Sequence, residues 1–247
     1  MSSPPATANS KAPGSLVLLY HRMGTPLRRS IVRGQYTTPG CLRWQIHTLA
    51  RLGYHPAPLS AVLPPSMSEG RFAVTFDDGY AAVGRIAWPL LLELQVPMTL
   101  FVVAGAIGQS NHWDQAQGDC LEPMADAVLL RELADAGVEI GSHTMSHARL
   151  TACSNAELHT EIVDAKQKLE DLLGRPVPGF SYPYGAWDAR VRAAVIDAGY
   201  RYATATILGP VTTDTDPYLI PRVNMRWNTV GWLLQRKIRK AYRQGGA

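Results

Sequence analysis

The sequence predicts a single α/β domain built as a (β/α) barrel. Apolar, β-prone runs alternate with amphipathic helical stretches along most of the chain, an order typical of parallel strands covered by helices. Polar residues of chemical interest directly follow the predicted strands, at the carboxyl ends where barrel enzymes place their sites. A chain of 247 residues, 46% hydrophobic, can bury one sizeable core or two small ones. One domain is the simpler interpretation.

The composition narrows the function classes. The net charge of +4 and the pI of 9.0 are only mildly basic, and the basic residues concentrate near the C-terminus. This pattern does not support nucleic-acid binding as the main function. The three cysteines are odd in number and widely spaced, so we expect no disulfide framework and a reducing compartment.

The start of the chain predicts a cytoplasmic protein. Residues 1–14 are rich in Ser, Pro and Ala and lack the apolar core of a secretory signal, which indicates a disordered leader. No apolar run is long enough to span a membrane. A chain that had lost its original N-terminus would look the same, so this alternative stays open.

The first predicted strand covers residues 15–20 and ends at His21. Thr38 and Pro39 form a helix N-cap and first-turn pair, so we expect the first helix to begin there. The Arg-rich segment 23–37 predicts an exposed loop over the strand ends.

The next strand, residues 71–76, stops on Asp77, Asp78 and Gly79. An unpaired buried charge is strongly disfavoured, so two adjacent carboxylates at the end of a core strand need a neutralising partner. A bound cation, with one carboxylate beside it as a working base, would provide this partner. The alternative is an ordinary Asp-Gly turn that leads into the next helix.

His143 and His147 form the second polar cluster, after a short strand predicted at 137–141. On one helical turn, two residues four apart face the same way, as a shared metal requires. Together with a carboxylate from the Asp pair, they give the two-His, one-carboxylate set of a catalytic zinc or similar divalent site.

The remaining segments continue the alternation. We expect helices at 83–94, 129–136, 154–173 and 187–198, and strands at 98–103, before Tyr182, at 202–206 and at 218–223. Pro89 is a candidate for a kink in the first of these helices. The long loop 105–122 carries Trp113, which could stack on a sugar face or simply anchor its own loop.

Three motifs occur in register, namely Thr75-Phe-Asp-Asp-Gly79, His143-Thr-Met-Ser-His147 and Ser181-Tyr-Pro-Tyr-Gly185. In this order they resemble the motifs of the polysaccharide deacetylase family, the NodB-homology group of metal-dependent carbohydrate esterases. The resemblance covers roughly residues 16–224 and implies a distorted barrel with seven rather than eight strands. The chain most resembles the permuted poly-N-acetylglucosamine deacetylases, in which the strand of the catalytic acid comes first.

The resemblance implies a role for each motif residue. Asp78, His143 and His147 would bind a divalent metal, with Zn²⁺ as the first choice and Co²⁺, Ni²⁺, Fe²⁺ and Mn²⁺ as alternatives. Asp77 would be the general base. The backbone N–H of Tyr184 would donate to the oxyanion.

Two positions depart from the family pattern. No His follows His159, where the family's usual acid would lie, so we assign the general acid to His21; the alternative is a strand-end His bonded to backbone. Ser181 stands where the usual motif has an Arg that orients the base. Arg222 could supply that charge from another predicted strand, or it could be an ordinary surface residue.

Residues 227–244 predict a C-terminal amphipathic helix. Its apolar side comprises Val230, Leu233, Leu234, Ile238 and Ala241, and its basic side Arg236, Lys237, Arg239, Lys240 and Arg243. One interpretation is a helix that covers the barrel with a solvated basic face. The other is a peripheral contact with an anionic membrane.

These observations predict a metal-dependent N-deacetylase that releases acetate from an N-acetylated amino sugar, in a polysaccharide, an oligosaccharide or a lipid-linked precursor. One alternative is a carbohydrate-binding relative without turnover, although the four residues of the predicted metal site and base argue against it. The other is an amidase acting on a non-sugar amide, because surrounding loops choose the substrate.

Overall fold

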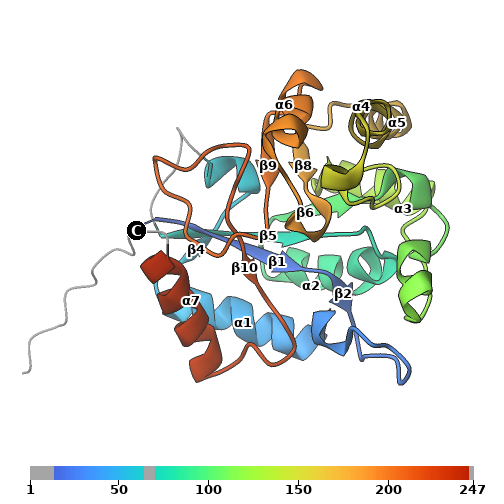
Figure 1. The fold of residues 1–247 in the computed structure, drawn as a ribbon. Coiled ribbons are helices and arrows are strands. Elements are labelled where there is room, and N and C mark those ends of the chain that lie inside the picture. Colours follow the sequence, from blue (N-terminus) through green and yellow to red (C-terminus); the bar gives the residue numbers. More distant parts are fainter. Residues whose placement is uncertain (1–13, 64–69, 245–247) are drawn as a thin grey trace, which may run out of the picture.

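In the computed structural model, which describes residues 14–63 and 70–244, seven parallel strands pair in the order β10-β1-β5-β6-β7-β8-β9 (Figure 1). The strands are β1 (Leu16–Tyr20), β5 (Arg71–Phe76), β6 (Met98–Val102), β7 (Glu139–Ser142), β8 (Gly179–Ser181), β9 (Tyr202–Thr204) and β10 (Val223–Asn224). An eighth short strand, β4 (His55–Pro56), pairs with the first residues of β5.

The sheet curls until its two ends meet. Beyond β9, a parallel bridge joins Thr204 to Ile220, and Ile220 accepts a hydrogen bond of 2.9 Å from the Ala205 N–H. Three residues later the chain enters β10, which pairs with β1 through Leu18 and Val223. The segment 217–224 therefore forms a seam between the last strand and the first. The predicted distorted, seven-stranded barrel is confirmed.

Apolar side chains lie on both faces of the strands, as expected for buried parallel sheet. Val17, Ala73, Phe101 and Tyr202 come from four different strands of the ring and form one small buried cluster, which fills part of the barrel interior. Leu18, on the opposite face of β1 from Val17, belongs to the larger core that includes helix residues. The barrel thus has an inner and an outer apolar layer.

Helices cover the outside of the barrel (Figure 1). They are α1 (Pro39–Arg51), α2 (Trp88–Glu93), α3 (Ala127–Asp135), α4 (Asn155–His159), α5 (Ala165–Leu173), α6 (Ala189–Asp197) and α7 (Trp232–Gln244). Thr38 accepts from the Cys41 N–H, as predicted, and Ser154 forms a capping box with Glu157 at the start of α4. A π-helical turn, Thr160–Asp164, links α4 to α5.

The helix expected around Pro89 is irregular before the proline rather than at it. Val83–Ala87 is a π-helix in which the Trp88 N–H donates to Val83 O, five residues earlier. Pro89 cannot donate to this ladder, so the change of hydrogen-bond pattern falls at the junction with α2.

The C-terminal helix is shorter than predicted. It begins at Trp232 instead of residue 227, after Gly231, whose φ of 56° breaks the helical path. Its apolar side packs inward through Leu234, Ile238 and Ala241, whereas Val230 stays outside the helix and 38% exposed. Nearly all of the predicted leader, residues 1–13, lies outside the described residues.

Among the described residues, no helix combines the length and the apolar character needed to cross a membrane. The cytoplasmic location and the reducing compartment expected from the sequence stay predictions.

Candidate active site

Asp77 and Asp78 extend from the carboxyl end of β5 and are both buried. The Asp77 N–H still donates to Tyr20 O at 3.0 Å, as a strand residue would. Asp78 then adopts a left-handed conformation with φ 75°, followed by Gly79 at φ 91°. A side chain at Gly79 would place Cβ 3.3 Å from Val102 Cα, so glycine suits this turn. The Asp-Gly turn considered as the alternative is present, and it directs both carboxylates into the site.

His143 and His147 do come together, but not on the helical turn that their spacing suggested. They lie in an irregular loop after β7 in which Thr144 and His147 have φ values of 70° and 64°. Two left-handed residues within one turn are incompatible with an α-helix. The loop is held instead by Glu161, whose carboxylate accepts from the Met145 N–H at 3.1 Å and the Ser146 N–H at 2.9 Å.

The two imidazoles and Asp78 converge with the spacing of metal ligands. Asp78 Oδ1 lies 3.5 Å from His143 Nε2 and 3.4 Å from His147 Nε2. Three ligands placed tetrahedrally around Zn²⁺ at ordinary bond lengths are about 3.3 Å apart. The side chains therefore fit a divalent metal.

The outer nitrogens of both imidazoles are also occupied. His143 Nδ1 lies 2.8 Å from Ser181 O, and His147 Nδ1 lies 3.1 Å from the Tyr184 hydroxyl. Such partners fix the ring orientation and leave Nε2 for a metal. Burial alone would raise the pKa of Asp78, but hydrogen bonds with the two imidazoles hold it well below its usual value.

Arg222 grips Asp77 through two parallel hydrogen bonds of 2.7 Å, from Nη1 to Oδ1 and from Nη2 to Oδ2. Ser181 Oγ donates to Asp77 Oδ2 at 3.1 Å and accepts from Arg222 Nη2 at 3.0 Å. Only 1% of Arg222 is exposed, which rules out the alternative of a surface residue. Burial would raise the pKa of Asp77, but the charge and hydrogen bonds of Arg222, together with the nearby imidazoles of His143 and His21, lower it below its usual value. The carboxylate of Asp77 is therefore ionised at neutral pH.

His21 follows β1 and lines a cavity of about 130 Å³ together with Asp77, Asp78 and both imidazoles. Its Nδ1 atom is buried and has no hydrogen-bond partner among the described residues, so the structure offers no support for a strand-end His bonded to backbone. Burial lowers the pKa of His21 despite the nearby carboxylates.

Tyr184 lies in the turn after β8 and also borders the cavity. Its backbone is left-handed, with φ 58°, and a Cβ on Gly185 would fall 1.9 Å from Thr206 Oγ1. This tight turn fixes the direction of the Tyr184 backbone. The guanidinium of Arg149 lies 4.8 Å from the Tyr184 ring centre, a contact that adds to the hydroxyl contact with His147.

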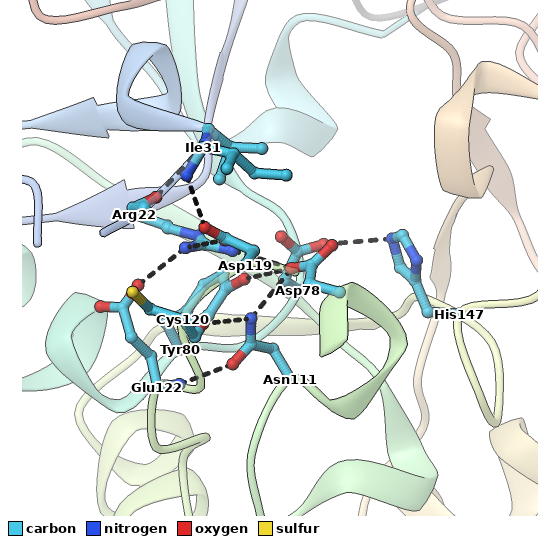
Figure 2. Close-up of polar contacts among 12 residues, drawn as sticks. Arg22, Ile31, Asp78, Tyr80, Asn111, Asp119, Cys120, Glu122 and His147 are labelled. Carbon is cyan, nitrogen blue, oxygen red and sulfur yellow. Dashed lines mark hydrogen bonds and ion pairs between the residues drawn. The ribbon is translucent and has the colours of Figure 1, made fainter. Parts of the chain in front are cut away.

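Sequence reasoning missed a buried ionic cluster beside the site, shown in Figure 2. Arg22 is 1% exposed and forms ion pairs with Asp114 at 2.7 Å, Asp119 at 2.7 Å and Glu122 at 2.9 Å. Its guanidinium also lies 4.9 Å from the Tyr80 ring centre. All three carboxylates belong to the long loop 105–122, so one cation of the first strand region holds this loop. Two features of the sequence could have predicted this cluster: three acidic residues in one loop, and an Arg directly after His21.

The anchored loop places Trp113 against the metal-site residues. Its ring stacks on His147 with centroids 4.8 Å apart and an interplanar angle of 23°. Asp114, the next residue, borders the cavity and accepts from Asn111 Nδ2 at 2.9 Å. The loop therefore forms one wall of the site.

Comparison with known proteins found similar sequences and similar folds. YxkH of Bacillus subtilis, provisionally named a polysaccharide deacetylase, is 24% identical over 211 residues, which cover 85% of this chain and 70% of that protein. A chitooligosaccharide deacetylase of Rhizobium leguminosarum bv. trifolii is 31% identical over 130 residues, covering 52% of this chain and 53% of that one. The structure of IcaB from Ammonifex degensii matches with a TM-score of 0.76 at 20% identity, over 92% of this chain and 97% of that chain.

The profile of the family named polysaccharide deacetylase matches residues 65–203, which include the Asp pair, both imidazoles and the Tyr184 turn. The match extends over more than half of the chain, and the fold agrees with it. We conclude that the chain belongs to the polysaccharide deacetylase family.

Proposed function

We propose that this protein is a metal-dependent N-deacetylase that hydrolyses the acetamide of an N-acetylated amino sugar and releases acetate. The observation that carries the proposal is the division of labour between adjacent carboxylates. Asp78 faces both imidazoles, whereas Asp77 is held apart by Arg222. One carboxylate is thus available as a metal ligand and the other as a base. The chitooligosaccharide deacetylase among the relatives supports a saccharide substrate.

Asp78, His143 and His147 would hold the metal, and we propose Zn²⁺. Two imidazoles and one carboxylate with an open position form a ligand set that catalytic zinc uses. When bound, such an ion polarises a carbonyl oxygen and lowers the pKa of a bound water. Co²⁺, Ni²⁺, Fe²⁺ and Mn²⁺ accept similar ligands, so metal analysis has to include them.

In the proposed reaction, Asp77 takes a proton from the attacking water. The bidentate contact with Arg222 fixes the plane of its carboxylate, and the Arg222 charge keeps it ionised and ready to accept a proton. Ser181 restrains the same oxygen that Arg222 Nη2 contacts. These contacts support Arg222 as the replacement, from another part of the chain, for the Arg that usual family members carry at the position of Ser181.

His21 would pass a proton to the departing amine as the C–N bond breaks, and the Tyr184 N–H would donate to the developing oxyanion. Because burial favours neutral His21, the proton that it delivers must reach it during turnover. The proton that Asp77 removes from water is the source of the proton that His21 delivers. The oxygen of the water then ends in acetate, and the proton ends on the amine.

The test combines metal analysis of the purified protein with acetate release from N-acetylated saccharides and from non-sugar acetamides. We expect stoichiometric divalent metal and release from saccharides. Asp77→Asn should keep the metal and lose release by 100-fold or more, on the order of one general base. Release from non-sugar acetamides alone would indicate an amidase, and bound metal without release from any substrate would indicate a binding protein.

A further inference from the structure

A second cavity, of about 430 Å³, lies between the turn after β10 and the first turns of α7. We call it the basic pocket, because its lining includes four cationic side chains and no acidic one: Arg226, Arg236, Lys237 and Lys240. None of the four forms an ion pair within residues 14–63 and 70–244. The pocket therefore presents concentrated positive charge that the protein does not neutralise.

Lys237 is fixed in the wall of this pocket. Its ammonium donates to Asn224 O and, at 3.3 Å, to Thr229 Oγ1. Burial, aided by the charge of Arg226, lowers the pKa of Lys237 to about 8. Burial therefore disfavours the charged form of Lys237 despite these two acceptors, and an anion in the pocket would favour it.

Exposed apolar side chains belong to the same segment, each next in sequence to a residue that lines the pocket. Trp227, Val230 and Trp232 are 55%, 38% and 64% exposed. Large apolar side chains grouped on a surface usually mark an interaction site. Trp is favoured where one side of the ring meets water and the other meets lipid, and cations beside it attract anionic headgroups. A free phosphate would use the cations but leave the apolar side chains in water.

We propose that the basic pocket and its exposed apolar side chains bind the surface of a membrane that carries anionic phospholipid. The buried side of α7, with Leu234, Ile238 and Ala241, already packs on the barrel, so the membrane contact uses the side of α7 that lines the pocket, with Arg236 and Lys240, and leaves the fold unchanged. The contact lies just beyond the carboxyl end of β10, on the rim where the candidate active site lies. Binding would bring that rim close to the membrane surface.

The test is flotation of the full chain with phosphatidylcholine vesicles, with and without phosphatidylglycerol. We expect binding only with phosphatidylglycerol, and weaker binding as salt rises. Arg236→Gln with Lys240→Gln should weaken binding about 30-fold, which follows from about fivefold for each cation near an anionic surface. Trp227→Ser with Trp232→Ser should also weaken it.

The matched control is Arg239→Gln with Arg243→Gln, which removes the same charge from exposed positions of α7 outside the pocket. It should weaken binding by less than about threefold. If the two double variants lose vesicle binding equally, the pocket is not the site of membrane contact. If the protein does not float with either kind of vesicle but binds inorganic phosphate or an RNA oligonucleotide, the membrane is not the partner of the pocket. None of these outcomes depends on acetate release, so the proposed enzyme activity is tested separately.

Discussion

At the residue scale, Asp77 and Asp78 reach different partners because the backbone turns between them. Asp77 keeps its strand hydrogen bond to Tyr20, whereas Asp78 has left-handed φ. Neighbouring carboxylates consequently face a guanidinium on one side and two imidazoles on the other. Two chemically identical groups can then take different roles, each set by its surroundings.

His21 supports the first prediction at this scale. We expect His21→Ala to keep its metal, because the ligand set is intact, and to lose turnover by about 10²- to 10⁴-fold, the usual contribution of a general acid. The measurements are metal content and kcat for acetate release. His47→Ala, on the exposed side of α1, is the control and should behave as the parent. Turnover near the parental level in His21→Ala would remove His21 from the mechanism.

The second prediction at the residue scale concerns the ion pair between Arg222 and Asp77. Arg222→Met leaves the buried Asp77 carboxylate without its cation, and breaking such a pair costs about 3–5 kcal/mol of unfolding free energy. Ser181→Ala removes a single hydroxyl contact and should cost only about 1 kcal/mol. Denaturant titration gives both values, and acetate release should fall more in Arg222→Met. Equal stability of the two variants would contradict this account.

At the element scale, the loop with both imidazoles shows where spacing alone misleads. The separation of four residues, taken together with the Asp pair, predicted that His143 and His147 lie side by side near a carboxylate, and they do. The helical turn inferred from that separation was wrong. The loop depends on Glu161, which lies in the linked helix α4–α5 and accepts from the loop N–H groups. Such a long-range contact leaves no local periodic pattern. Arg22 and its loop carboxylates were missed for the same reason.

The wall formed by loop 105–122 supports the third prediction. Arg22→Met would leave three carboxylates without their shared cation, which should loosen Trp113 from His147. We expect a marked fall in melting temperature and metal affinity lower by about 10- to 100-fold, as for other residues that support ligands. Competition with a chelator measures the affinity.

The control for this loss is Arg43→Met. Arg43 pairs with Glu93 on the surface, where ion pairs contribute little to stability. The melting temperature and metal affinity of the Arg43→Met variant should therefore stay close to those of the parent. If Arg22→Met binds metal as tightly as Arg43→Met, the loop does not support the metal site.

At the scale of the whole molecule, alternating strands and helices sufficed to predict a β/α barrel, and the motif order, through the family resemblance, supplied the strand number. Both depend on local sequence. The seam could not be predicted from the alternation or the motif order, because residues 205–222 contain little regular structure and close the ring through a few backbone contacts. Arg222 lies in this seam, and its Nε donates to Ala205 O at 3.1 Å.

The seam supports the fourth prediction. Because it has few backbone hydrogen bonds, it should open before the rest of the barrel, and Arg222 should then leave Asp77. In urea, with metal in excess, we expect acetate release to be lost at a lower concentration than helical circular dichroism. Coincident midpoints would mean that the seam unfolds together with the barrel.

The placement of Arg222 also has a consequence during synthesis of the chain. The Asp pair, both imidazoles and the Tyr184 turn all leave the ribosome before residue 222 does, so a nascent chain can contain every candidate metal ligand before it contains the arginine that fixes Asp77. If Asp77 is the base that we propose, hydrolytic competence would arrive last, when closure of the ring brings Arg222 to Asp77.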